Sequence, residues 1–356
     1  MDELLDLELS LRGLGNAGYA VALSFSDPDS DADVRIERGT SEHPIRFDLE
    51  RLRAVAADPA AYGAALGSML FSDGDILAQF TAARAIARRG RRPIPIRFRL
   101  FIAPSAAELH ALRWETLRTP DGEPLLMGEE VFFSRYVTSN DVQPIRARPR
   151  GALRVLVAIA NPAGVERFGL APVDVAGELA RARAGFGEFD LVALTEPGAA
   201  TVDQIISSLR GAAREGRPFD ILYLVAHGSY VEGNTYLWLV KPDNAFERVD
   251  GASFCQRLRE LSERPRLVML IACQSAGGMT ADNGALSVIG PRLAEAGIPA
   301  VIAMQGNVSM RLTERFVPAF CKELLHDGVI DAAMALARGA VRDLPDHLDA
   351  GALFAP

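Results

Sequence analysis

The sequence predicts an α/β fold with a mainly parallel sheet sandwiched by helices, preceded by an N-terminal extension that is β-rich and helical. From residue 153 onward, short apolar runs alternate with amphipathic segments of helical spacing. These runs stay apolar at successive positions, which is typical of strands buried on both faces. Before residue 148 the strands instead alternate polar and apolar residues, as half-buried strands do.

The N-terminal part mixes strands and helices. Strands are expected at 4–13, 19–25, 94–104 and 130–137, and helical segments at 47–71, 75–90 and 105–117. The motif GLGNAG at residues 13–18 matches a dinucleotide-binding pattern, which requires a helix after its last glycine. A strand follows here, so the motif is interpreted as the turn of a hairpin.

The best domain boundary is the stretch DVQPIRARPRG at residues 141–151, which holds two prolines and several charges. It divides the chain into an extension with a regulatory part, residues 1–148, and a core, residues 149–356.

The core repeats strand and helix in regular order. Strands are expected at 153–160, 190–194, 219–226, 235–240, 267–273 and 298–304, and helices at 175–185, 201–216, 251–261, 284–297, 312–325 and 329–341. Thr201 and Gln204 have the spacing of a capping box, so one helix is expected to begin near Thr201. This order predicts a parallel sheet with helices on both faces.

Composition excludes several classes of function. The 356-residue chain has a net charge of -8, which argues against binding nucleic acid or an anionic membrane. The one basic run, residues 88–93, follows a helical segment and is interpreted as a solvated helix end. The acidic N-terminus is no signal peptide, and no apolar run is long enough to span a membrane. Three cysteines make no disulfide scaffold, so a cytoplasmic protein with reduced thiols is expected.

Two of the predicted buried strands end in reactive side chains. The strand at 219–226 leads directly into His227 and Gly228, and the strand at 267–273 ends in Cys273. Ligands of open parallel sheets bind at the carboxyl ends of the strands. If the two strands are neighbours, His227 and Cys273 face one cleft.

This pair fits nucleophilic catalysis by cysteine, because an imidazole can take the thiol proton and stabilise the thiolate. The backbone N–H groups of Gly228 and Cys273 can donate to an oxyanion. Taken singly, each residue is better explained as a structural one, a small buried hydrophobe or a hydrogen-bonded histidine. Because His227 and Cys273 occupy corresponding positions at the ends of two buried strands, the catalytic explanation is preferred for the pair. Cys255 and Cys321 lie in helical patterns and are interpreted as core residues.

No cofactor and no metal site are predicted, because no Cys/His cluster has ligand spacing. The remaining histidines follow no buried strand: His43, His110, His326 and His347.

The segments ILYLVAHGSY…YLWL and LVMLIACQSAGG…IPAVIAMQGNVS resemble the two halves of the CHAT family of caspase-like cysteine peptidases. The stretch LHALRWETLRTPDGEPLLMGEEVFFSRYV resembles the segment that precedes the peptidase core in that family. The resemblance covers residues 95–345. It implies a caspase-hemoglobinase fold with His227 as base and Cys273 as nucleophile. It also implies an effector that a partner or sensor activates, in bacterial defence or cell death.

Substrate preference does not carry over from the family. Caspases have Gln and many metacaspases have Asp two residues before the cysteine, where this chain has Ile271. Glu232 and Asp282, in expected loops after the catalytic strands, are candidates to pair with a basic substrate side chain, and Ser275 is a further candidate substrate contact. Solvated loop carboxylates are the plainer explanation.

The sequence thus predicts a cysteine endopeptidase that cleaves a protein substrate. The segment 229–234 is expected to be a loop that an activating protein partner orders, with residues 1–100 as the docking surface for that partner. Two alternatives stay open: a catalytically silent caspase-like adaptor, and a cysteine acyl-hydrolase acting on small molecules.

Overall fold

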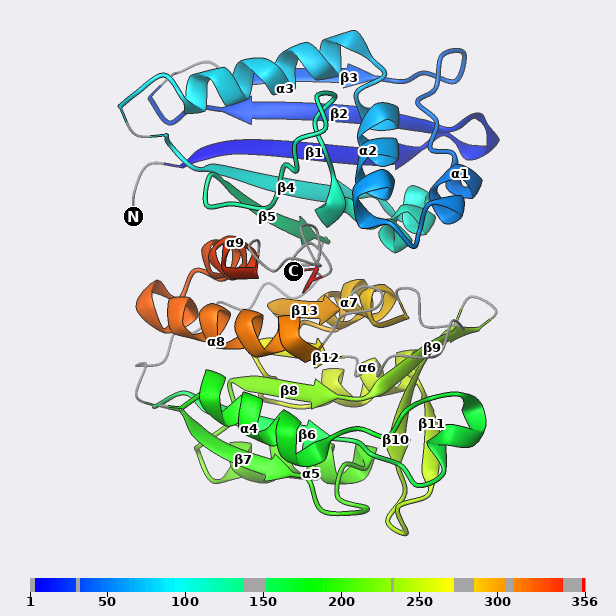
Figure 1. Cartoon of the computed structure of the whole chain (residues 1–356), viewed down its shortest axis with the longest axis vertical. Coiled ribbons are helices and arrows are strands. Elements are labelled where there is room, and N and C mark those ends of the chain that lie inside the picture. The colour runs from blue at the N-terminus through cyan, green and yellow to red at the C-terminus, as the bar shows by residue number, and fades with distance from the viewer. Residues whose placement is uncertain are drawn as a thin grey trace. The chain divides into compact units, whose positions relative to one another are not determined.

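The computed structural model describes residues 4–29, 33–91, 93–137, 152–187, 189–231, 234–271, 285–304, 310–341 and 354–355. The chain forms two compact units, each shown in Figure 1. Unit 1 holds residues 1–137 and 329–356, and unit 2 holds residues 138–328. The boundary predicted near residue 148 lies in a stretch outside the described residues, so its position stays a prediction. Unit 1 also takes in helix α9 (Ile330–Val341), which lies within residues 149–356, the predicted core.

Unit 1 is a mixed sheet in the order β3-β2-β1-β4-β5, with helices packed on it. Its strands are β1 (Leu5–Gly13), β2 (Tyr19–Ser26), β3 (Val34–Arg38), β4 (Ile96–Ile102) and β5 (Val131–Tyr136), and the helices before β4 are α1 (Leu49–Ala54), α2 (Pro59–Leu70) and α3 (Gly74–Ala87). Strand β1 runs antiparallel to β2 and parallel to β4. Helix α9 packs beside β5.

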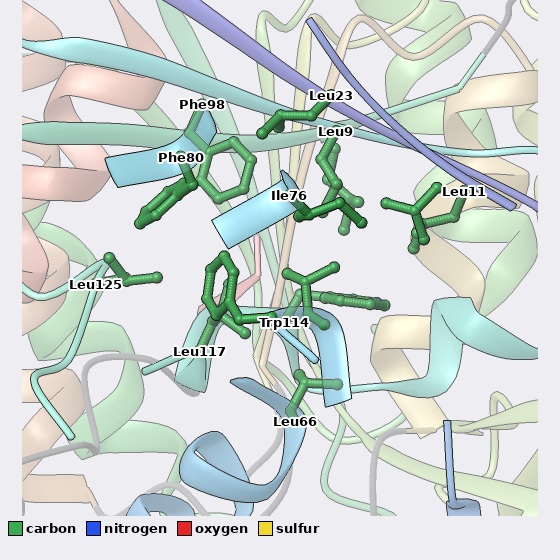
Figure 2. Close-up of a cluster of buried hydrophobic side chains, with 14 of the residues drawn as sticks. Leu9, Leu11, Leu23, Leu66, Ile76, Phe80, Phe98, Trp114, Leu117 and Leu125 are labelled. Carbon is green, nitrogen blue, oxygen red and sulfur yellow. The ribbon is translucent and has the colours of Figure 1, made fainter. Parts of the chain in front are cut away.

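The core of unit 1 forms where one face of this sheet meets α2 and α3. Successive residues of β1 alternate between buried and partly exposed, which is the pattern the sequence predicts for a half-buried strand. Figure 2 shows Leu9 and Phe98 of the sheet facing Ile76 and Phe80 of α3. The Phe80 and Phe98 ring centroids lie 6.3 Å apart. Burial of each such side chain contributes about 1.5–3 kcal/mol.

The glycine-rich motif at residues 13–18 connects β1 and β2, so the hairpin interpretation is confirmed. Gly13 pairs with Tyr19 across the two strands. Gly18 has φ +138, and a Cβ there would come within 2.7 Å of the Ile45 carbonyl oxygen. The motif therefore needs glycine for backbone shape rather than for a phosphate.

Two helical predictions in unit 1 need correction. The segment 47–71 is not one helix, because α1 ends at Ala54 and α2 begins at Pro59. The Asp58 carboxylate accepts hydrogen bonds from the backbone N–H groups of the first turn of α2, and proline at the first helical position fits that start. The segment 105–117 forms short 3-10 helices, with a non-helical residue at Ala106.

Unit 2 contains the predicted parallel sheet. Its strands are β6 (Arg154–Ile159), β7 (Asp190–Leu194), β8 (Ile221–Val225), β12 (Leu267–Ile271) and β13 (Ala300–Met304), and its helices are α4 (Val175–Gly185), α5 (Val202–Arg214), α6 (Gly251–Arg259), α7 (Ala285–Glu295) and α8 (Met310–Asp327). These strands lie in the order β13-β12-β8-β6-β7, and each neighbouring pair is parallel. The predicted fold class is therefore confirmed.

Helices cover both faces of this sheet. Leu156, Leu222 and Val268 point to one face, where they share a buried cluster with residues of α5, α6 and α7. On the other face, the ring of Tyr223 lies 5.6 Å from that of Phe186, at the end of α4, and α8 packs against α4 (Figure 1). Helix α5 is capped by Thr201, whose hydroxyl accepts from the Gln204 N–H, so the predicted cap is confirmed.

A second, small antiparallel sheet follows β8. It consists of β9 (His227–Val231), β10 (Asn234–Val240) and β11 (Phe246–Asp250), in the order β11-β10-β9. The expected loop at 229–234 is thus wrong for Ser229–Val231, which form part of β9, and for Asn234, which begins β10. Ser229–Val231 pair with β10, and Tyr230 and Val231 are types that favour strands. Of that expected loop, residues 232 and 233 lie outside the described residues.

Candidate active site

His227 occupies the junction between the two sheets of unit 2. Strand β8 ends at Val225, and His227 begins β9 two residues later. The Ala226 N–H donates to the Ile271 carbonyl, 3.1 Å away, so the main sheet remains paired up to the residue before the histidine. The side chain of His227 is only 1% exposed. The histidine therefore sits at the carboxyl edge of the parallel sheet, as the sequence predicts.

One ring nitrogen of His227 is fixed by the backbone. Its Nε2 lies 2.9 Å from the carbonyl oxygen of Ala171, in the segment between β6 and α4. A carbonyl can only accept, so Nε2 carries the proton and Nδ1 of the neutral ring holds a lone pair. Among the described residues, Nδ1 has no hydrogen-bond partner. Burial lowers the pKa of His227 below its usual 6.5, while the bond to Ala171 opposes that shift. The ring is thus a neutral base at pH 7 with one nitrogen available.

The pairing register of β8 and β12 is the observation that bears on Cys273, the residue predicted to act with His227. Strands β8 and β12 are neighbours and parallel, and Val225 pairs with Ile271. His227 and Cys273 each follow that pair by two residues in sequence. Cys273 itself lies outside the described residues, together with the other predicted substrate contacts, Ser275, Glu232 and Asp282. Gly228, the predicted oxyanion donor, pairs with Leu237 in β9 and β10.

The other two cysteines are core residues, as predicted. Cys255 in α6 is 5% exposed, and Cys321 in α8 is fully buried. Burial raises the pKa of the Cys255 thiol to about 12, and burial also raises the pKa of the Cys321 thiol. A thiol that holds its proton this firmly is a poor nucleophile at pH 7.

The described part of the chain contains no group of three or more His, Cys, Asp or Glu residues that would hold a metal ion. Within the same residues, no helix combines the length and apolar character needed to cross a bilayer.

Sequence reasoning missed the surroundings of His227. It did not assign a role to Ala171, which lies 56 residues before the histidine. It also missed a group of three aromatic rings, formed by Phe168 in the segment between β6 and α4, Trp238 of β10 and Phe246 of β11. The signal available was the aromatic residues of 235–240, which were interpreted only as part of a strand, and Phe246, in a segment to which no element was assigned.

The fold and the strand-end histidine define an α/β protein with a candidate base at the carboxyl edge of its parallel sheet. The CHAT domain family model matches residues 61–350, and the chain belongs to this family. The resemblance stated from the sequence is therefore confirmed.

This chain is also similar to solved structures, at low sequence identity. The complex of Porphyromonas gingivalis RgpB pro- and mature domains has 12% identity and a TM-score of 0.40, covering 80% of this chain and 68% of that chain. The Drosophila initiator caspase Dronc has 14% identity and a TM-score of 0.30, covering 59% and 82%. The D319A mutant of the PilB minor pilin from Streptococcus sanguinis has 9% identity and a TM-score of 0.29, covering 92% and 79%. No curated protein sequence matches this chain.

Proposed function

We propose that this protein is a cysteine endopeptidase that cleaves a protein substrate with a dyad of His227 and Cys273. The observation that carries the proposal is the state of His227, a buried neutral imidazole with Nε2 held by Ala171 and Nδ1 free of a described partner. Membership of a family with a caspase-like peptidase fold supports it.

The proposed reaction begins with proton transfer from the Cys273 thiol to Nδ1 of His227. The thiolate attacks the carbonyl carbon of the scissile peptide bond, and the carbonyl electrons move to oxygen. The N–H groups of Gly228 and Cys273 donate to that oxyanion, and one such donor contributes about 2.7–4 kcal/mol in other acyl-transfer enzymes. His227 then protonates the leaving amine. Water, deprotonated by His227, hydrolyses the thioester and restores the thiol.

The fixed tautomer suits this sequence of steps. Because Nε2 is held as a donor, Nδ1 can alternate between accepting and giving a proton without any rotation of the ring. Burial keeps the imidazole neutral at pH 7, so the base form is ready before substrate binds.

An activating partner is a second part of the proposal. An unrestrained endopeptidase would damage its host, so we expect low turnover until another protein or sensor binds, in a defence or cell-death setting. The earlier idea that a partner orders residues 229–234 loses its basis, since Ser229–Val231 are already paired with β10. Comparing turnover of the purified chain alone with turnover after adding proteins that co-purify with it tests this part.

The experiment that tests the proposed activity is cleavage mapping with three variants. The wild type, Cys273→Ala and the control Cys255→Ala are each incubated with candidate protein substrates and co-purifying proteins, and new N-termini are identified. We expect internal cut sites with the wild type and Cys255→Ala and none with Cys273→Ala. Cuts that persist in Cys273→Ala would overturn the proposal. Binding of a partner without any Cys273-dependent cut would favour the silent adaptor, and turnover of small esters alone would favour the acyl-hydrolase.

A further inference from the structure

An aromatic cluster lies on the small sheet beside His227. The ring of Phe168 is 5.0 Å from that of Trp238 and 4.8 Å from that of Phe246, in edge-to-face geometry. The rings of Trp238 and Phe246 stack at 5.7 Å. We call these three residues the aromatic cluster. It joins the segment between β6 and α4 to strands β10 and β11 (Figure 1).

The aromatic cluster is tied to the proposed base by short connections. Trp238 is the cross-strand partner of His227, and directly opposed residues project from the same face of an antiparallel pair. The indole Nε1 of Trp238 donates to the Ser229 hydroxyl at 3.0 Å, which fixes the ring on that face. Phe168 lies three residues before Ala171, whose carbonyl holds His227. The cluster therefore borders the proposed reaction centre.

The cluster is only partly covered. Phe168 is 42% exposed, and in the described part of the chain it is the one aromatic ring among the exposed large apolar side chains. Val231, also 42% exposed, lies in β9 four residues after His227 and so on the same face. Preformed, rigid aromatic rings of this kind are frequent anchors for bound peptides and proteins.

Two arginines flank the aromatic cluster. The guanidinium carbon of Arg167 lies 5.5 Å from the ring centroid of Phe168 and 5.7 Å from that of Phe246. Arg248 is the cross-strand partner of Trp238, and its guanidinium carbon lies 4.5 Å from the Tyr236 ring. Both arginines are exposed, and no carboxylate of the described residues forms an ion pair with either. In contrast, Arg257 of α6 pairs with Asp203 at 2.8 Å.

We infer that the aromatic cluster, with Arg167 and Arg248, is a subsite for the substrate chain, which binds a peptide segment carrying an aromatic side chain next to an acidic one. The substrate ring packs against Phe168 and Trp238, and the substrate carboxylate pairs with the two guanidinium groups. This inference rests on the proposed peptidase function, because it assigns a substrate preference to that same site.

Charge favours this occupant over others. The chain as a whole carries a net charge of -8, so an acidic segment is repelled over most of the surface and attracted where Arg167 and Arg248, which form no ion pair with a described carboxylate, border the aromatic cluster. A purely apolar segment would leave both guanidinium groups unused, and a basic one would be repelled by them.

The test selects random decapeptides displayed on phage against the full chain with Cys273→Ala, so that bound peptides are not cut. Enriched peptides are then synthesised with a fluorophore, and their affinity is measured. Phe168→Ala and Arg167→Gln, each in the Cys273→Ala background, probe the subsite. Val192→Ala, an exposed residue of β7, and Arg210→Gln, an exposed unpaired arginine of α5, are the matched controls.

We expect enriched peptides to place Phe, Tyr or Trp within two or three residues of Asp or Glu. Affinity should fall about tenfold or more in Phe168→Ala and roughly threefold to tenfold in Arg167→Gln, with no change in either control. Raising the salt concentration should weaken peptide binding to the Cys273→Ala chain more than binding to the same chain with Arg167→Gln.

Enrichment of peptides without an aromatic and acidic pair would overturn the inference, as would no enrichment or equal affinity in Phe168→Ala and Val192→Ala. If the proposed peptidase function is wrong, the experiment gives a different result. In that case the selected peptides still bind through Phe168, but the chain with Cys273 intact does not cut them. If the chain instead cuts protein substrates at a rate that Phe168→Ala and Arg167→Gln leave unchanged, the function stands and the subsite is wrong.

Discussion

The two ends of the main sheet in unit 2 differ in how completely their buried polar side chains are hydrogen-bonded. At the amino end, Asp220 precedes β8 and is 3% exposed. Its carboxylate accepts the backbone N–H of Arg154 at 3.0 Å and lies 3.1 Å from a guanidinium nitrogen of Arg266. Its carbonyl accepts from the N–H groups of Arg266 and Leu267. A single aspartate thus joins the beginnings of β6, β8 and β12.

At the carboxyl end of β8, His227 is equally buried but only half satisfied among the described residues. Its Nε2 is bonded to Ala171, and its Nδ1 has no described partner. A buried polar atom without a partner costs about 1–3 kcal/mol. The comparison teaches that the polar groups of Asp220 are bound at the amino end of the sheet, whereas the carboxyl end leaves one buried nitrogen available, as the proposed mechanism requires.

The largest effect expected from this difference is on catalysis. His227→Ala should lower the rate of cleavage about 10³-fold, equivalent to about 4 kcal/mol of barrier, because no base remains to take the thiol proton. The free energy of unfolding should change by no more than about 1–2 kcal/mol. His326→Ala, which replaces an exposed histidine of α8, is the control and should leave both quantities unchanged. Equal rates in the two variants would refute the assigned base.

Asp220→Ala should show the reverse pattern. The free energy of unfolding should fall by about 3–5 kcal/mol, since the guanidinium of Arg266 and the N–H of Arg154 lose a buried partner. Turnover per folded molecule should stay the same. The control is Asp190→Ala, whose carboxylate is 44% exposed and pairs with Arg154 and Arg217, with an expected cost of at most about 1 kcal/mol. Denaturant titration measures both variants, and a loss of turnover without a loss of stability would contradict the structural role.

The pH dependence of stability compares two buried histidines. Burial lowers the pKa of His227 below 6.5, and burial together with the Arg135 cation lowers the pKa of His110 to about 4. The unfolded chain takes up these protons at higher pH than the folded chain, so stability is full above pH 6.5 and falls as the pH drops. For partly exposed His110 the loss by pH 4 should be roughly 1–2 kcal/mol.

His110→Gln and His227→Gln should each make the acid decline of stability shallower, as measured by urea titration at pH 4.5, 5.5, 6.5 and 7.5. His326→Gln serves as the exposed control and should leave the profile unaltered. A decline of the same size in all three variants would show that other groups cause it.

The smallest expected effect is on stability and concerns Thr201, which follows β7 in sequence and caps helix α5. Thr201→Ala should lower the free energy of unfolding by about 1 kcal/mol, because the Gln204 N–H loses its cap. Ser207→Ala, at an exposed position of α5, should change it by less than about 0.5 kcal/mol. Unchanged turnover in both variants would sharpen the comparison. It would show that Thr201 takes no part in the proposed reaction of His227 and Cys273.

Features that depend on residues close together in the sequence could be predicted from the sequence alone. The apolar run at 219–226 leads directly into His227, and parallel strands share their carboxyl edge, so the position of His227 at that edge was predictable. The Thr201 cap was also predictable, since capping depends on residues three apart. The start of α2 was available in the Asp58–Pro59 pair, which the longer helical periodicity of 47–71 obscured.

Contacts between distant parts of the chain were not predictable in this way. The bond from His227 to Ala171 and the contact of Phe168 with Trp238 depend on how the segment after β6 crosses the small sheet. Ser229–Val231 were expected to form part of a loop directly after His227, but these residues pair with β10.

The most direct test of the central claim is the pH dependence of alkylation at Cys273, because it needs neither a substrate nor an activator. The folded wild type and His227→Gln are treated with iodoacetamide between pH 5 and 9, and modification of each cysteine is followed by mass spectrometry. We predict that Cys273 reacts about tenfold or more faster in the wild type at pH 7, while Cys255 and Cys321 stay unmodified in both proteins. Equal rates at Cys273 with and without His227 would contradict the dyad.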